Sequence, residues 1–153
     1  MFASATYTTK SEPGTLTTYA ALRFMGDKLE PSRITELLGA QPTTVYRKGE
    51  VYKRVRGREV RGRTGLWRLS TKGRVNSPDL HEHLNYLLGV LFPPSDRELV
   101  ESLRALMRED GLQADVSCFW HGERGAQAPL VPEGVRTAFA RVSAQIETDF
   151  ATD

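Results

Sequence analysis

Alternating apolar and polar positions predict four β-strands in this chain. Each candidate is short, carries aromatic or branched side chains, and is bounded by turn residues or by a helical pattern. The last candidate alternates Ile146, Thr148 and Phe150 with polar neighbours, which indicates one face against a core and one face in water. The four ranges are 18–24, 64–70, 114–120 and 145–150.

A helical spacing of apolar residues fills the intervals between these strands. Pro31 suits the first turn of a helix, because its missing N–H would have no partner there, and Gly39 stands where a left-handed cap is expected. Two leucine-striped helices follow each other directly within residues 77–110, which predicts an antiparallel helical hairpin. Pro132 opens the last predicted helix.

The order of these elements predicts an α+β fold. Apolar residues fall three and seven positions after Pro31, and again three and seven positions after Pro132. We therefore expect a ferredoxin-like four-stranded sheet made from two βαβ halves, with the helical hairpin inserted between them. Trp67 and Trp120 each lie close to a glycine in a predicted strand, and we expect both in the core.

Length and composition predict one globular domain over residues 16–153. The chain has 153 residues, of which 39% are hydrophobic and 26% charged. Residues 1–15 are rich in serine and threonine, and we expect them to form a flexible N-terminal tail without a signal-peptide pattern. The apolar stretch LLGVLF is far shorter than the ~20 residues that span a bilayer, so we expect no membrane contact. A single cysteine cannot form an intramolecular disulfide, which favours a cytoplasmic location.

The net charge of +2 conceals a strong asymmetry along the chain. Eleven basic residues lie between Arg47 and Arg74 against only Glu50 and Glu59, so this stretch carries +9 and the remainder carries −7. We call residues 46–64 the basic arm, and its valines alternate with charged residues as in a projecting two-stranded ribbon. Its candidate binding residues are Tyr46, Arg47, Lys48, Tyr52, Lys53, Arg54, Arg56, Arg58, Arg61 and Arg63.

The basic arm allows several interpretations. It can engage an acidic protein partner, or it can bind RNA or single-stranded DNA through arginine–phosphate contacts and tyrosine–base stacking. It can also be a solvated segment that protects a sheet edge from pairing, or one that folds back on the acidic body. We expect a non-enzymatic binding module that engages an anionic protein partner through the arm.

The histidines and the cysteine do not form a recognisable reactive motif. In the segment HEH, His81 and His83 lie about 200° apart around a helix axis, so they cannot share one metal ion, and we expect both to be partly exposed. Cys118 with a histidine base is the enzymatic alternative. Its place between Val116 and Trp120 in an alternating strand indicates a small core residue instead. We therefore expect no enzyme activity, no metal and no cofactor.

Several segments, taken in their order, resemble a known bacterial family. The segments are LEPSRITELLGAQPT, YRKGE, TGLW, HLNYLLGVL and SCFW, and together they cover about residues 18–150. They resemble the domain-of-unknown-function family DUF4279. The resemblance implies a small α+β domain without an assigned activity, and it adds an immunity-type protein that binds a toxin as a further alternative. The arginine–glycine run of this chain is longer and more basic than the family pattern requires. The structural motif residues are Pro31, Leu38, Gly39, Pro42, Thr43, Gly49, Gly65 and Trp67, with Trp120 in the last segment.

Overall fold

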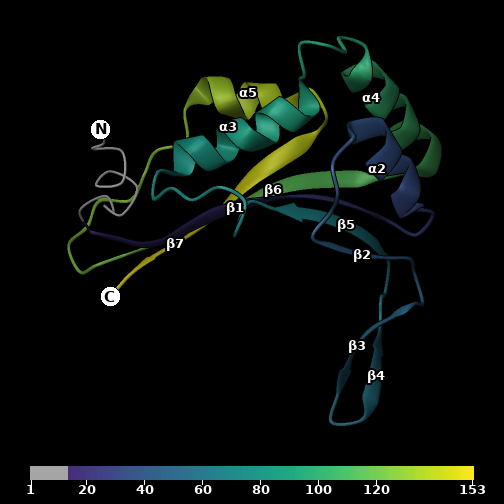
Figure 1. The fold of residues 1–153 in the computed structure, drawn as a ribbon, viewed down its shortest axis with the longest axis horizontal. Helices are drawn as coiled ribbons and strands as arrows, with labels where there is room; N and C mark the ends of the chain where they lie inside the picture. The colour runs from purple at the N-terminus through teal and green to yellow at the C-terminus, as the bar shows by residue number, and fades with distance from the viewer. Residues whose placement is uncertain (1–13) are drawn as a thin grey trace, which may run out of the picture.

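The helices of the protein gather on one face of a β-sheet, and a thin ribbon projects from the other side (Figure 1). The structure is a computed structural model that describes residues 14–153. Its elements are β1 (Thr15–Gly26), α2 (Pro31–Leu38), β2 (Thr44–Tyr46), β3 (Val51–Val55), β4 (Arg58–Arg61), β5 (Gly65–Ser70), α3 (Leu80–Leu91), α4 (Leu99–Asp110), β6 (Gln113–Gly122), α5 (Glu133–Ala140) and β7 (Ala144–Thr152). The predicted α+β class is confirmed.

The main sheet has five strands in the order β2-β5-β1-β6-β7. Only β6 and β7 are parallel neighbours, and α5 connects them. All four predicted strands are present, but the predicted count is wrong because β2 adds to the free edge of β5. Three residues are too few to show a period of two, so β2 left no signal in the sequence.

The ferredoxin-like arrangement of two βαβ halves is not confirmed. The second half exists as β6, α5 and β7. In the first half, however, β1 and β5 pair antiparallel, with Phe24 opposite Trp67. The strand that runs parallel to β1 after α2 is β2, and β5 lies between the two.

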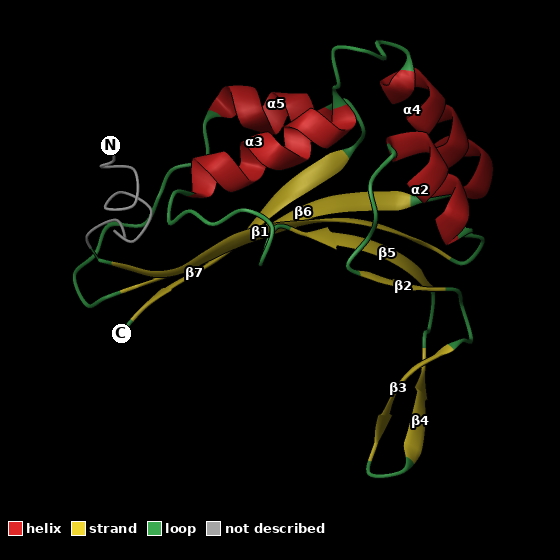
Figure 2. Ribbon diagram, in the orientation of Figure 1, coloured by secondary structure: helices red, strands yellow, loops and turns green. Residues whose placement is uncertain are grey.

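The core lies between the sheet and the four helices (Figure 2). Ala20, Leu22 and Phe24 of β1 point to the helices and are fully buried, because alternate residues of a strand share a face. Trp67 is fully buried as well, and its indole N–H donates to Thr35 Oγ1 of α2 at 3.0 Å. Trp120 of β6 is also buried, and it donates to Thr15 Oγ1 at 3.2 Å.

The two central helices do not pack as the predicted antiparallel hairpin. Figure 1 shows α3 beside α5, whereas α4 lies beside α2 over the other end of the sheet. Residues 92–98 connect them and are long enough to let each leucine stripe face the sheet separately. The buried stripe residues are Leu80, Leu84, Leu87 and Leu91 of α3, and Leu99, Leu103 and Leu106 of α4.

Two of the motif glycines have a clear steric or conformational reason. Gly39 ends α2 at φ 67°, a left-handed conformation that glycine adopts without strain. A Cβ at Gly65 would lie 2.7 Å from Leu29 Cβ and 2.8 Å from the Gly26 carbonyl oxygen, so a larger residue would push β5 away from β1. The predicted tail lies outside the described residues except for its last two, of which Thr15 already belongs to β1. In residues 14–153, no helix is long and apolar enough to cross a membrane.

Candidate functional site

The basic arm forms a two-stranded antiparallel ribbon that is separate from the main sheet. It leaves the body after β2 and returns into β5, on the side of the sheet that faces away from the helices (Figure 2). Lys53 lies opposite Val60, Arg54 opposite Glu59, and Val55 opposite Arg58. Residues that are directly opposite share a face, so one face of the ribbon combines lysine and arginine with two valines.

An arginine occupies the tip of the ribbon in an unfavourable backbone conformation. Arg56 has φ 51° and Gly57 has φ 79°. Positive φ at both central residues of a hairpin turn favours Asn-Gly or Asp-Gly, because a larger side chain crowds its own backbone there. The turn therefore carries a cation at the far end of the arm, at a cost of about 1 kcal/mol relative to an unstrained residue.

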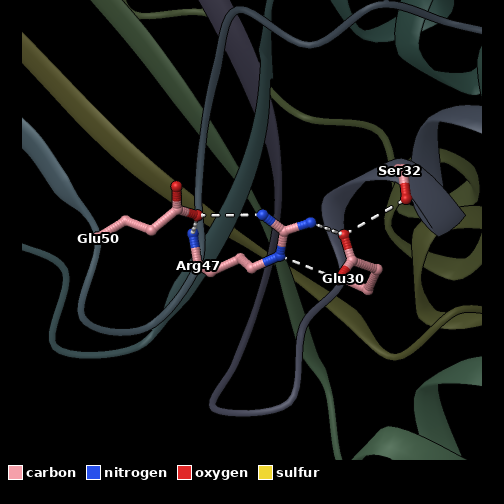
Figure 3. A network of polar contacts seen from close by, with 4 residues as sticks. All are labelled: Glu30, Ser32, Arg47 and Glu50. Atoms are coloured by element: carbon pink, nitrogen blue, oxygen red, sulfur yellow. Dashed lines mark hydrogen bonds and ion pairs between the residues drawn. The ribbon is translucent and has the colours of Figure 1, made fainter.

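Two predicted binding residues anchor the root of the arm to the body. Arg47 forms a bidentate ion pair with Glu30, with Nε to Oε2 at 2.9 Å, and it also contacts Glu50 (Figure 3). Lys48 Nζ lies 3.0 Å from Asp27 Oδ2. These bonds lower the pKa of the Glu30 and Asp27 carboxyls and raise the pKa of Arg47. The root of the arm is thus tied to the loop between β1 and α2.

Two more cations of the arm share one carboxylate on the ribbon itself. Arg54 and Arg61 lie 3.0 Å and 2.8 Å from the Glu59 oxygens, and Arg61 also donates to the Gly49 carbonyl. Half of the eight cations of the arm are therefore paired with acidic groups of the chain itself, as in the interpretation in which the arm folds back. The other four are exposed and form no ion pair within residues 14–153: Lys53, Arg56, Arg58 and Arg63.

The two tyrosines of the arm stack on each other at its root. The Tyr46 and Tyr52 rings are 4.3 Å apart at 13°. Gly62 makes room for this stack, since a Cβ there would lie 2.5 Å from Tyr46 Cδ1. Burial raises the pKa of Tyr46. Tyr52 remains 41% exposed, and Lys53 Nζ lies 5.7 Å from its ring centroid. Of the two stacked rings, only that of Tyr52 is available to a partner.

A second surface, the sheet face turned away from the helices, was not predicted as a site. We call it the uncovered sheet face; it consists of Tyr19, Ala21, Arg23 and Met25 of β1, the residues opposite them in β5 and β6, and Gln145, Glu147 and Asp149 of β7. Tyr19 stacks on Phe119 at 4.5 Å, and Arg23 holds Asp115 through two bonds of 2.8 Å and 2.6 Å. The Asp115 bond raises the pKa of Arg23. An arginine at the centre of a strand was the signal in the sequence, but its partner lies 92 residues away.

The chain matches the model of one known protein family. The family model described as "Domain of unknown function (DUF4279)" matches residues 16–152. The chain belongs to this family. The match spans the main sheet, the helices and the basic arm of this DUF4279 domain, and it confirms the resemblance drawn from the sequence segments. No curated protein and no solved structure matches it. The family description names no activity, so a function has to be argued from the geometry.

The histidines of the DUF4279 domain are dispersed. His81 is exposed, and His121 lies 2.8 Å from Asp153 at the end of β7. His83 was expected to be partly exposed, which is wrong: it is buried, and its Nε2–H donates to the Ser77 carbonyl at 2.7 Å. A carbonyl can only accept, so the contact with Ser77 fixes the proton on Nε2. Nδ1 therefore accepts a hydrogen bond from Thr71 Oγ1 at 2.6 Å. Within residues 14–153, no three His, Cys, Asp or Glu side chains lie together as metal ligands would.

Cys118 lies in the core of the DUF4279 domain, and the described residues include no hydrogen bond between it and a histidine. It is fully buried in β6, and burial raises the pKa of its thiol to about 11. A hollow of about 600 Å³ opens beside the start of the loop after β1, and its lining contains neither Cys118 nor a histidine. The positive charge of Arg136 lowers the pKa of this thiol by less than burial raises it, so the thiol is not activated as a nucleophile.

We expect Cys118 to resist thiol reagents in the folded DUF4279 domain. At pH 8 a thiol with a pKa of about 11 is about one-thousandth thiolate, and burial also excludes the reagent. With Ellman's reagent the native protein should show no release of thionitrobenzoate over minutes, and one equivalent should appear after unfolding in guanidinium. Stoichiometric labelling of the native protein would instead revive the enzymatic alternative.

Proposed function

We propose that this DUF4279 domain is a non-enzymatic binding module that holds an acidic protein surface with its basic arm. The observation that supports this proposal is the set of four exposed cations on a ribbon whose root is fixed by Arg47 and Lys48. Because the other four cations already occupy the nearby carboxylates, these four unpaired cations are left to an external partner. A toxin with an acidic surface would be one such partner, so the immunity-type role is a special case.

The composition of the ribbon faces supports a protein partner more than a nucleic acid. Lys53 and Arg58 share their face with Val55, which is 48% exposed, and with Val60. Such a mixture of apolar and basic groups suits a protein interface. On the other face Glu59 sits between Arg54 and Arg61 and would repel a phosphate backbone. Stacking of Tyr46 on Tyr52 also occupies one ring face that a nucleic-acid base would need.

A binding titration with simple probes tests the proposal. A fluorescein-labelled polyglutamate peptide stands for an acidic protein surface, and a labelled oligouridine of equal charge stands for a single-stranded nucleic acid. The variant changes Lys53, Arg56, Arg58 and Arg63 to Gln, which keeps the paired cations in place. We expect it to bind polyglutamate about 30-fold more weakly, since four exposed ionic contacts contribute about 0.5 kcal/mol each.

The matched control removes the same charge from elsewhere on the surface. Arg97, Arg108, Arg124 and Arg136 are exposed arginines outside the arm, and their change to Gln should leave polyglutamate binding within about twofold, because a distant exposed charge contributes little. Equal weakening by both variants would mean a general charge effect and would contradict the proposal. Tighter binding of oligouridine, falling steeply with salt, would instead establish the nucleic-acid alternative.

A further inference from the structure

The basic arm and the uncovered sheet face lie on the same side of the protein. Figure 1 shows all four helices on one side of the main sheet and the arm projecting on the opposite side. None of the helices or strands of residues 14–153 covers the outward face of β1 and β6. The arm and this face therefore border the same open space on the side of the sheet away from the helices.

Opposite charges lie on the two sides of β1 in the uncovered sheet face. Next to the arm, β5 contributes Arg68, which lies opposite Arg23. At the other edge, β7 contributes Glu147 and Asp149, which are exposed and belong to no ion pair of the described residues. Asp115 lies between the two edges and is already paired with Arg23. The face is thus positive on the arm side and negative along β7.

The centre of the same face is partly apolar. Tyr19 and Phe119 stack there, and Lys72 Nζ lies 5.2 Å from the Tyr19 ring centroid. Met25 and Leu66, which lie opposite each other in β1 and β5, are also half-buried. An apolar centre with charged edges is the usual composition of a protein interface, in which the centre is buried and the rim stays polar.

The order of the strands makes this face complementary to itself. β1 is the middle strand, with β5 and β2 on one side and β6 and β7 on the other. If two such faces meet around a two-fold axis parallel to β1, the arm side of each copy lies over β7 of the other. An axis across the strands would instead bring arm against arm, which like charges disfavour.

The length of the arm fits this arrangement. Two sheets that pack face to face are about 10 Å apart, whereas the five residues of β3 span about 16 Å, so the arm can cross the gap and reach the edge of the facing sheet. A two-stranded ribbon alone is only marginally stable in water, so a surface that receives the arm would also stabilise it.

From these observations we infer that the acidic partner of the basic arm is a second copy of this chain. In the resulting two-fold dimer, the uncovered sheet faces meet and each arm lies along Glu147 and Asp149 of the other copy. This inference rests on the proposed function, because it names the acidic surface that the arm binds.

Sedimentation velocity of the full chain with two charge-reversal variants tests the inference. The arm variant carries Lys53→Glu, Arg56→Glu and Arg58→Glu; the face variant carries Glu147→Lys and Asp149→Lys. We expect the wild type to sediment as a dimer at low salt and to dissociate at high salt. Each variant alone should be monomeric. An equimolar mixture of the two should form dimers again, since the negative arm then meets the positive face and the unchanged pair of surfaces also remains.

The controls separate failure of this inference from failure of the proposed function. Glu36→Lys with Glu133→Lys reverses two exposed charges on the helical side, and this variant should dimerise like the wild type. A wild type that stays monomeric but binds polyglutamate through its arm would overturn the second copy as the partner and leave the proposed function intact. A dimer that persists in both reversal variants would overturn the inference as well. Far-UV circular dichroism of each variant checks that the fold is retained.

Discussion

Trp67→Ala is expected to lower the free energy of unfolding by about 4 kcal/mol, because it removes the largest fully buried side chain of the core. The Trp67 ring packs edge-on against Phe24 at 5.7 Å, and its N–H holds Thr35 of α2. A cavity of this size collapses only in part, so its lining loses contacts that it does not regain. The change would consume a large share of the ~5–15 kcal/mol that stabilises an ordinary domain.

Denaturant unfolding followed by far-UV circular dichroism measures this loss. Trp67→Phe retains most of the ring volume and loses the hydrogen bond to Thr35, so we expect it to cost about 1–2 kcal/mol. Val45 provides a matched control, because it lies directly opposite Trp67 in β2 yet is 44% exposed. Val45→Ala should cost less than about 1 kcal/mol. A similar value for Trp67→Ala would contradict the core position of the indole.

Thr71→Val should lower the free energy of unfolding by about 2–4 kcal/mol without changing the side-chain volume. The Thr71 hydroxyl accepts from the Ala20 N–H at 2.9 Å and donates to His83 Nδ1 at 2.6 Å, and all three residues are buried. Valine leaves both partners without a bond, and each unsatisfied buried polar group costs about 1–3 kcal/mol. These bonds connect β1 to the start of α3 through the segment after β5.

Thr71→Ser separates the hydroxyl from the methyl group. It keeps both hydrogen bonds and loses one methyl, so we expect a cost of about 1 kcal/mol. Faster hydrogen exchange of the Ala20 amide in Thr71→Val, but not in Thr71→Ser, would locate the effect at this bond. Equal stability of the two variants would show that the hydroxyl contributes nothing.

The core positions and the candidate surfaces depend on each other through β5 and β2. The basic arm leaves the body after Tyr46 and returns just before Gly65, two residues from Trp67. Trp67 fixes β5 against the helices, while Arg47 and Lys48 fix the root of the arm to the loop before α2. The direction of the arm relative to the uncovered sheet face is therefore set by the same packing that stabilises the fold.

Much of the local structure was predictable from neighbouring residues. α2 begins at Pro31 and is capped by Gly39, as predicted. Both leucine-striped helices exist because their apolar residues repeat every three or four positions. The predictions of a hairpin between α3 and α4 and of a partly exposed His83 failed for one reason. Which helix packs beside which, and which polar group a histidine meets, depend on residues that are distant in the sequence.

The sequence by itself determined the α+β class, the family, the charge division of +9 against −7 and the cations of the basic arm. These follow from local periodicity and composition, which any short window contains. Only the tertiary structure decided that four of the arm cations are paired within the chain and that the arm shares a side with the uncovered sheet face. The composition of the uncovered sheet face also depends on the strand order, because the pairing of β1 with both β5 and β6 brings residues from distant parts of the chain onto one face.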